Sequence, residues 1–206
     1  MNTGVSTFAA AATAFCALTR DIPENAWGAV GLGEWDVRTL VGHTAMAVRA
    51  VSECLNAVAE REDIPSAPAY YGAIRHFAQT AGANELNTEL SRRAADDLGA
   101  DPVAAVDHIV RLALSDLEAT EDRLVGVFGG VLGIRLSSFV PTRIFELAVH
   151  SLDLAQATGV PLVMPDEVIA DAAMLAARIA VESGHGSDVL LALTGRVGLA
   201  PGFSAL

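Results

Sequence analysis

The segment TRIFELAVHSLDLA, residues 142–155, decides what kind of fold this chain can have. At 100° per residue along a helix, its four ionisable side chains, Arg143, Glu146, His150 and Asp153, fall within about 80° of arc. Most other positions are apolar, and a helix that is apolar on nearly every side is normally buried. Buried charges must be paired or bind a metal ion, so the segment predicts a compensated polar site inside a helical protein.

A second predicted helix supplies a histidine from a distant part of the chain. This helix is expected to begin at the N-cap residue Asp36 and to continue to about Arg61, with His43 in the middle of its apolar stripe. Glu146 and His150 are one turn apart, as in the HExxH helices that present neighbouring metal ligands. Two imidazoles and one carboxylate suit zinc with an open fourth position, and iron or nickel would accept the same set.

Each part of this predicted site has a structural alternative. An inward histidine such as His43 is more often a hydrogen-bonded core residue than a ligand, and Glu146 could simply pair with His150. The metal interpretation is narrowly favoured because two inward-facing sites can meet in a bundle. Asp153 could fix the tautomer of a ligand imidazole, and Arg143 could neutralise a carboxylate or hold an anionic substrate. A structural ion pair is an equal alternative for both residues.

The rest of the sequence is also mostly helical. Helices are predicted over about 6–19, 36–61, 70–79, 85–98, 101–123, 137–158 and 166–182, with connections rich in proline and glycine. The glycines between 126 and 133 predict a flexible turn or a short extended connection. This pattern favours an all-α four-helix bundle with an additional C-terminal helix and a short irregular tail. We expect residues 1–185 to form the bundle and residues 186–206 to form a tail packed on it.

Composition limits the classes of function. The chain has 206 residues, of which 52% are hydrophobic, and this suits one compact domain. Its 13 basic and 25 acidic residues give a net charge of −12, which repels nucleic acid and anionic membrane surfaces. All 13 basic residues are arginine, so a Schiff-base lysine, a Walker lysine and a lysine general base are excluded. No P-loop, G-x-G-x-x-G or G-x-S-x-G string occurs either.

The location and partners follow from the same composition. The apolar stretch near the N-terminus is shorter than the roughly 20 residues that span a bilayer. Two cysteines, Cys16 and Cys54, lie in apolar helical patterns and indicate neither a disulfide framework nor a cysteine-rich zinc site. We expect a cytoplasmic protein without nucleic-acid or membrane partners, which could form a homodimer through an apolar helix face.

Two motifs resemble the mycothiol-dependent maleylpyruvate isomerase family of the DinB-like superfamily. Residues 33–43, GEWDVRTLVGH, are similar to its W-[TD]-V-R-D-L-hydrophobic-x-H segment, and residues 142–155 are similar to its R-x-x-E-x-x-x-H-x-x-D-L segment. The ending LTGR at 193–196 and PGF at 201–203 is similar to the endings of shorter members. The resemblance implies a DinB-like bundle that holds a divalent metal with His43, Glu146 and His150 and uses the small thiol mycothiol.

The resemblance leaves the reaction open. Characterised isomerases of the family carry an additional C-terminal domain that contributes to the active site, whereas this sequence stops at residue 206 and resembles a short member without the full domain. A first hypothesis is a metal-dependent isomerase or thiol S-transferase that activates a small thiol beside an electrophilic substrate. A second is a metal-dependent hydrolase in which Asp153 or a neighbouring carboxylate manages protons. A third is a non-catalytic metal-binding bundle with a regulatory or interaction role.

Overall fold

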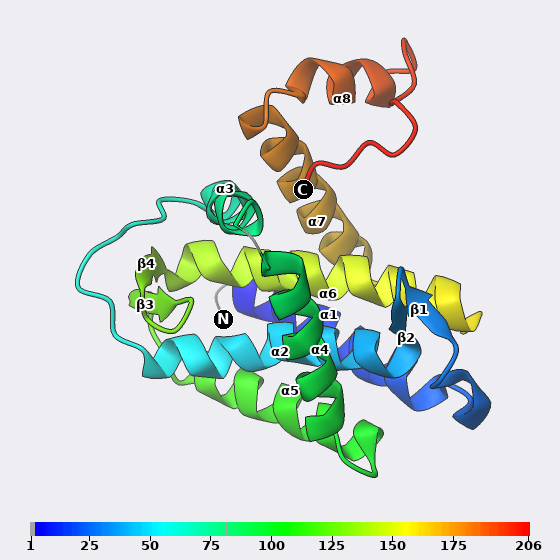
Figure 1. Cartoon of the computed structure of the whole chain (residues 1–206). Helices are drawn as coiled ribbons and strands as arrows, with labels where there is room; N and C mark the ends of the chain where they lie inside the picture. The colour runs from blue at the N-terminus through cyan, green and yellow to red at the C-terminus, as the bar shows by residue number, and fades with distance from the viewer. Residues whose placement is uncertain (1–2, 81) are drawn as a thin grey trace.

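The computed structural model describes residues 3–80 and 82–206, which form a predominantly helical protein (Figure 1). The described helices are α1 (Thr3–Asp21), α2 (Val37–Asn56), α3 (Ala67–Ala78), α4 (Ala83–Asp97), α5 (Pro102–Glu118), α6 (Leu136–Thr158), α7 (Asp166–Glu182) and α8 (Gly186–Leu193). A short 3-10 turn, η1 (Glu24–Ala26), follows α1. Two antiparallel hairpins complete the described elements: β1 (Val30–Leu32) with β2 (Trp35–Asp36), and β3 (Leu124–Val127) with β4 (Leu132–Arg135).

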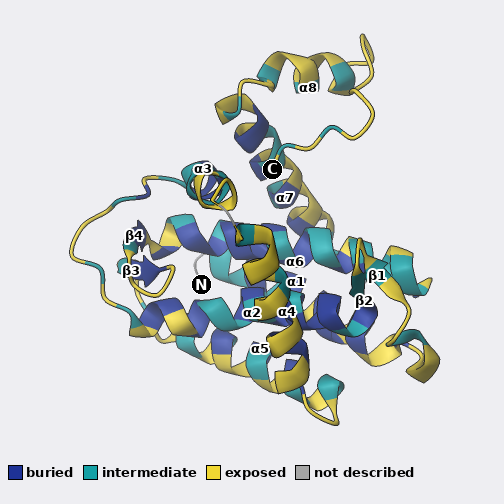
Figure 2. Cartoon of the chain, viewed as in Figure 1, coloured by how far each residue is buried: buried dark blue, intermediate teal, exposed yellow. Residues whose placement is uncertain are grey.

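Helices α1, α2, α5 and α6 form a four-helix bundle, which confirms the predicted all-α, DinB-like fold. Both α1 and α2 pack against α5 and α6 (Figure 1). Buried residues gather along the facing sides of these helices (Figure 2). The largest fully buried side chains of the four helices are Phe8, Phe15, Leu18, Val37, Leu40, Leu117, Phe139, Ile144, Leu147 and Leu154. Their removal from water is the main source of stability for the bundle.

Local capping signals set several helix ends as predicted. The Asp36 side chain accepts a hydrogen bond from the Thr39 backbone N–H at 2.7 Å, and the first helical turn of α2 begins there. Asp101 plays the same part for α5. Gly159 ends α6 with a φ of 70°, a left-handed conformation that glycine adopts without steric cost.

Two helix ends were predicted wrongly, and the β3–β4 hairpin explains both. Helix α2 ends at Asn56, because Ala57 is extended and its carbonyl accepts a hydrogen bond from the Gly126 N–H at 2.7 Å. Helix α5 ends at Glu118 and the chain then enters the hairpin, whose strands satisfy their backbone groups by pairing. The glycine-rich segment 126–133 is therefore part of an ordered hairpin that caps one end of the bundle.

Helix α4 lies against α2 across the front of the bundle in Figure 1. Their backbones approach closely at Gly42, where a Cβ would lie only 2.5 Å from the Ala95 backbone nitrogen. Gly42 permits this approach because it has no Cβ. The contact matters for function because α4 faces the same stretch of α2 that carries His43.

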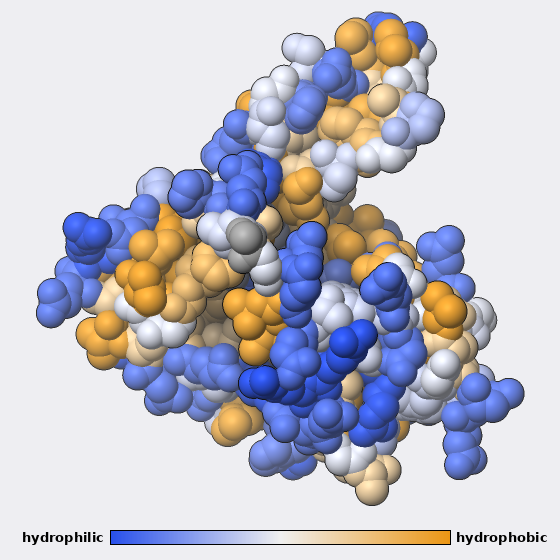
Figure 3. All heavy atoms as spheres, viewed as in Figure 1, coloured by the Kyte–Doolittle hydropathy of each residue, from blue (hydrophilic) through white to orange (hydrophobic). Residues whose placement is uncertain are grey.

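The C-terminal part of the chain begins with α7, which packs against α6 and α3. Helix α8 contacts α7 and contains no buried residue, and Leu190 and Leu193 are 63% and 77% exposed. Figure 3 shows apolar residues among hydrophilic ones on the surface of this projecting part of the molecule. The Arg75 side chain donates a hydrogen bond to the Ala205 carbonyl, which brings the chain end back to α3. The tail over 186–206 was predicted to be irregular, and this was wrong for residues 186–193, which form α8. The division into residues 1–185 and 186–206 stays a prediction.

No helix in the described part of the chain combines the length and apolar character that a bilayer crossing requires.

Candidate metal centre

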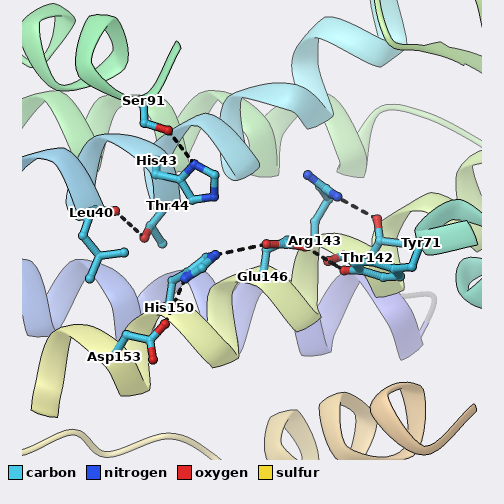
Figure 4. Close-up of polar contacts among 10 residues, drawn as sticks. All are labelled: Leu40, His43, Thr44, Tyr71, Ser91, Thr142, Arg143, Glu146, His150 and Asp153. Atoms are coloured by element: carbon cyan, nitrogen blue, oxygen red, sulfur yellow. Dashed lines mark hydrogen bonds and ion pairs between the residues drawn. The ribbon is translucent and has the colours of Figure 1, made fainter. Parts of the chain in front are cut away.

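Packing of α2 against α6 brings the three predicted ligands together (Figure 4). One donor atom from each of His43, Glu146 and His150 lies within 4.8 Å of the others. The two imidazole rings meet edge to face, with centroids 4.9 Å apart. His150 Nε2 lies 3.2 Å from Glu146 Oε2, close to the roughly 3.4 Å that separates two ligands of a tetrahedral ion with ~2.1 Å bonds.

His43 is held on three sides. Its Nδ1 lies 2.9 Å from Ser91 Oγ on α4, its ring lies 4.8 Å from the Trp35 ring of β2, and His150 faces it from α6. Burial lowers the pKa of His43 to about 4, and the positive charge of His150 acts in the same direction. His43 is therefore neutral at pH 7, which is the state that a metal ligand requires.

His150 lies between two carboxylates. Its Nδ1 is 3.1 Å from Asp153 Oδ2, and its Nε2 faces Glu146. Burial disfavours a charge on His150, but the hydrogen bonds to Asp153 and Glu146 outweigh it and raise the pKa. Burial tends to raise the pKa of Glu146. The hydrogen bond with His150 and the positive charge of Arg143 outweigh this effect and bring that pKa below its usual value. The two groups thus form an imidazolium–carboxylate pair at neutral pH.

The buried guanidinium of Arg143 makes most of its contacts with aromatic rings. The residue is 6% exposed, its Nε donates to Thr142 Oγ1, and its guanidinium lies 4.8 Å and 5.1 Å from the ring centroids of Phe139 and Tyr70. Among the ion pairs of residues 3–80 and 82–206, none joins Arg143 to Glu146 or Asp153. Its positive charge still favours the ionised form of Glu146 at longer range.

A family model described as "Mycothiol maleylpyruvate isomerase N-terminal domain" matches residues 8–155. The match runs from α1 through most of α6, and it includes all three candidate ligands. This chain belongs to that family. The family predicted from the two sequence motifs is thereby confirmed. Neither the curated proteins nor the solved structures contained a match.

Two side chains of this isomerase-family site were not found from the sequence. Tyr71, on α3, donates a hydrogen bond from its hydroxyl to Glu146 Oε1 at 2.8 Å, and Ser91 reaches His43 from α4. Both lie outside the family motifs, in helices that were themselves predicted. No periodicity marks them as site residues, because their contacts depend on how α3 and α4 cross the bundle.

The donor set fits a divalent transition metal. Neutral imidazole nitrogen and carboxylate oxygen are ligands that zinc accepts. Asp153 orients His150 and Tyr71 orients Glu146 through hydrogen bonds, and metal ligands in proteins usually have such partners. The side chains of His150 and Glu146 are 13% and 17% exposed, so both ligands keep some contact with solvent. Three protein donors leave a fourth tetrahedral position for an exogenous ligand.

Proposed function

We propose that the protein is a metal-dependent enzyme of the thiol S-transferase or isomerase type, which activates a small thiol for reaction with an electrophilic substrate. The observation that carries this proposal is the convergence of His43, Glu146 and His150 from two helices. Membership of the mycothiol maleylpyruvate isomerase family supports mycothiol as the thiol, and the donor set best suits zinc. A bound divalent ion would lower the pKa of a thiol in its open position and so supply a thiolate at neutral pH.

The side chains around the site support this role. Tyr71 holds Oε1 of Glu146, while Oε2 faces His150 and the centre. Asp153 accepts the Nδ1 proton of His150 and so directs Nε2 towards the same point. The two residues that flank the ligands thus orient them before any ion or substrate binds.

The cysteines of the described chain do not supply the nucleophile. Cys16 and Cys54 are both buried, and burial raises the pKa of each thiol to about 12. Neither is a thiolate at neutral pH. A thiol reaction at this site would therefore use an external thiol, as the proposed thiol transfer or thiol-assisted isomerisation does.

A hydrolase is supported less well by the same geometry. Asp153, which was expected to manage protons unless a neighbouring carboxylate does so, is engaged by His150 Nδ1. A non-catalytic bundle that keeps the metal for stability would bind the ion without any effect of thiols, and this property distinguishes it from the proposed enzyme. Cytoplasmic location and a homodimer remain predictions.

Elemental analysis of the protein purified without chelators tests the proposal first. We expect one divalent ion per chain, and its loss in His43→Ala and His150→Ala variants that remain helical by circular dichroism. His108→Ala, which removes an exposed histidine on α5, is the matched control and should keep the ion.

Thiol binding is then measured on the cobalt-substituted protein. Mycothiol should produce a sulfur-to-cobalt absorption band in the wild type, and turnover of an electrophile panel should require the thiol. A protein that binds no ion, or that binds an ion unaffected by thiols, would contradict the proposal. Thiol-free turnover of esters or amides would instead establish the hydrolase.

A further inference from the structure

We propose that Ser91, on α4, is a positioning residue that fixes His43 in the tautomer with the proton on Nδ1 and a free lone pair on Nε2. Ser91 lies 48 residues from His43 in sequence and belongs to a different helix. The consequence for metal binding rests on the proposed function, whereas the tautomer itself does not.

The Ser91 hydroxyl has two neighbours but only one proton, and this decides the direction of each hydrogen bond. A serine hydroxyl has one proton, and Ser91 Oγ donates it to the Asn87 carbonyl at 2.7 Å within α4. The same oxygen lies 2.9 Å from His43 Nδ1. Because its proton is already used, Ser91 Oγ accepts in this second contact and Nδ1–H donates. Ser91 is fully buried, so bulk water does not replace either hydrogen bond.

The protonation of Nδ1 determines what the other nitrogen can do. A neutral imidazole carries one proton, so Nε2 keeps its lone pair. Figure 4 shows Nδ1 turned to Ser91 and the other ring nitrogen on the side of His150 and Glu146. The opposite tautomer would direct an N–H at the centre, and His43 could then not act as a ligand there.

Two further contacts hold α4 against the site and so keep Ser91 beside His43. Trp35, whose ring lies against His43, donates from Nε1 to Thr88 Oγ1 at 3.3 Å, one turn before Ser91. Beyond Ser91, the Arg49–Asp97 ion pair of 3.1 Å joins the two helices again. Ser91 therefore orients His43 much as Asp153 orients His150, but with a neutral acceptor in place of a carboxylate.

The experiment measures the tautomer and the zinc affinity separately, on the full chain. Nitrogen-15 NMR of the chelator-treated protein reports which His43 nitrogen carries the proton, and competition with a chromophoric chelator gives the Kd for Zn²⁺. In the wild type we expect protonated Nδ1. Ser91→Ala should populate the other tautomer and weaken zinc binding about 10- to 100-fold, the usual effect of removing a group that orients a ligand.

Two further variants separate positioning from general support of the fold. Ser91→Thr keeps the hydroxyl and should retain the tautomer and the zinc affinity. Glu89→Ala removes an exposed pair with Arg93 within α4, which among the described residues contacts no member of the site, and should also leave both unchanged.

A wild type with protonated Nε2 overturns the proposal even if Ser91→Ala fails to fold. Equal tautomer populations in Ser91→Ala and the wild type, or an equal shift in Glu89→Ala, also overturn it. If the wild type binds no zinc, the proposed function fails, but the NMR measurement still decides the role of Ser91.

Discussion

Replacing Gly42 with alanine tests how closely α4 is packed on α2. The added Cβ would lie 2.5 Å from Ala95 N and 2.7 Å from Ala95 Cα, far inside van der Waals contact. Both atoms are backbone, so the whole helix must move. We therefore take the upper part of the usual overpacking cost, about 3 kcal/mol. The better helix propensity of alanine offsets about 1 kcal/mol of this cost, so the free energy of unfolding should fall by about 2 kcal/mol in total.

Thermal unfolding followed by circular dichroism measures this effect. For a chain of this size, a loss of about 2 kcal/mol corresponds to a Tm lower by about 4–8 °C. Gly72→Ala is the matched control, because Gly72 lies inside α3 and a Cβ there would meet nothing within 4 Å. The free energy of unfolding of Gly72→Ala should be higher than that of the wild type by about 0.5–1 kcal/mol.

The two glycine variants should therefore differ in sign. If Gly42→Ala were as stable as the wild type, or if both variants were stabilised alike, the close approach of α4 to α2 would be refuted. The zinc affinity of Gly42→Ala should also fall, since a shift of α4 carries Ser91 away from His43.

Three further predictions concern the site and the cysteines. Zinc affinity should rise with pH up to about 9, because the pKa of His150 is raised to about 9 and the ion must displace its proton. Calorimetry at pH 7.5 in buffers of different ionisation enthalpy should therefore detect close to one proton released per ion, and no release would contradict the assignment. Tyr71→Phe removes a hydrogen bond to the charged Glu146, and urea titration should show a free energy of unfolding lower by about 1.5–3 kcal/mol. Cys16 and Cys54, both buried with the pKa of each raised to about 12, should react with a thiol reagent only when the protein unfolds, and rapid labelling of the native protein would contradict this.

Much of the fold could be predicted because its signals are local. The prediction for residues 166–182 agrees with the bounds of α7, and that for 137–158 differs from α6 by one residue. Apolar periodicity and the capping residues Asp36, Asp101 and Gly159 act within one or two turns of the chain, so the sequence alone reveals them. The same periodicity placed Glu146 and His150 on one face of α6.

The tertiary structure decided whatever depends on contacts between distant segments. Helix α2 ends at Asn56 because Ala57 pairs with the β3–β4 hairpin, and no residue within the helix announces that partner. In the same way, Tyr71 and Ser91 reach the site only through the crossing of α3 and α4 over the bundle.

Sequence by itself thus determined seven of the eight described helices, all but α8, and the identity of the candidate ligands, because hydrogen bonding and side-chain periodicity within a helix are local properties. Only the packed structure decided the protonation of those ligands. The pKa values and tautomers of His43 and His150 depend on burial and on partners such as Ser91, which lies 48 residues from His43 along the chain.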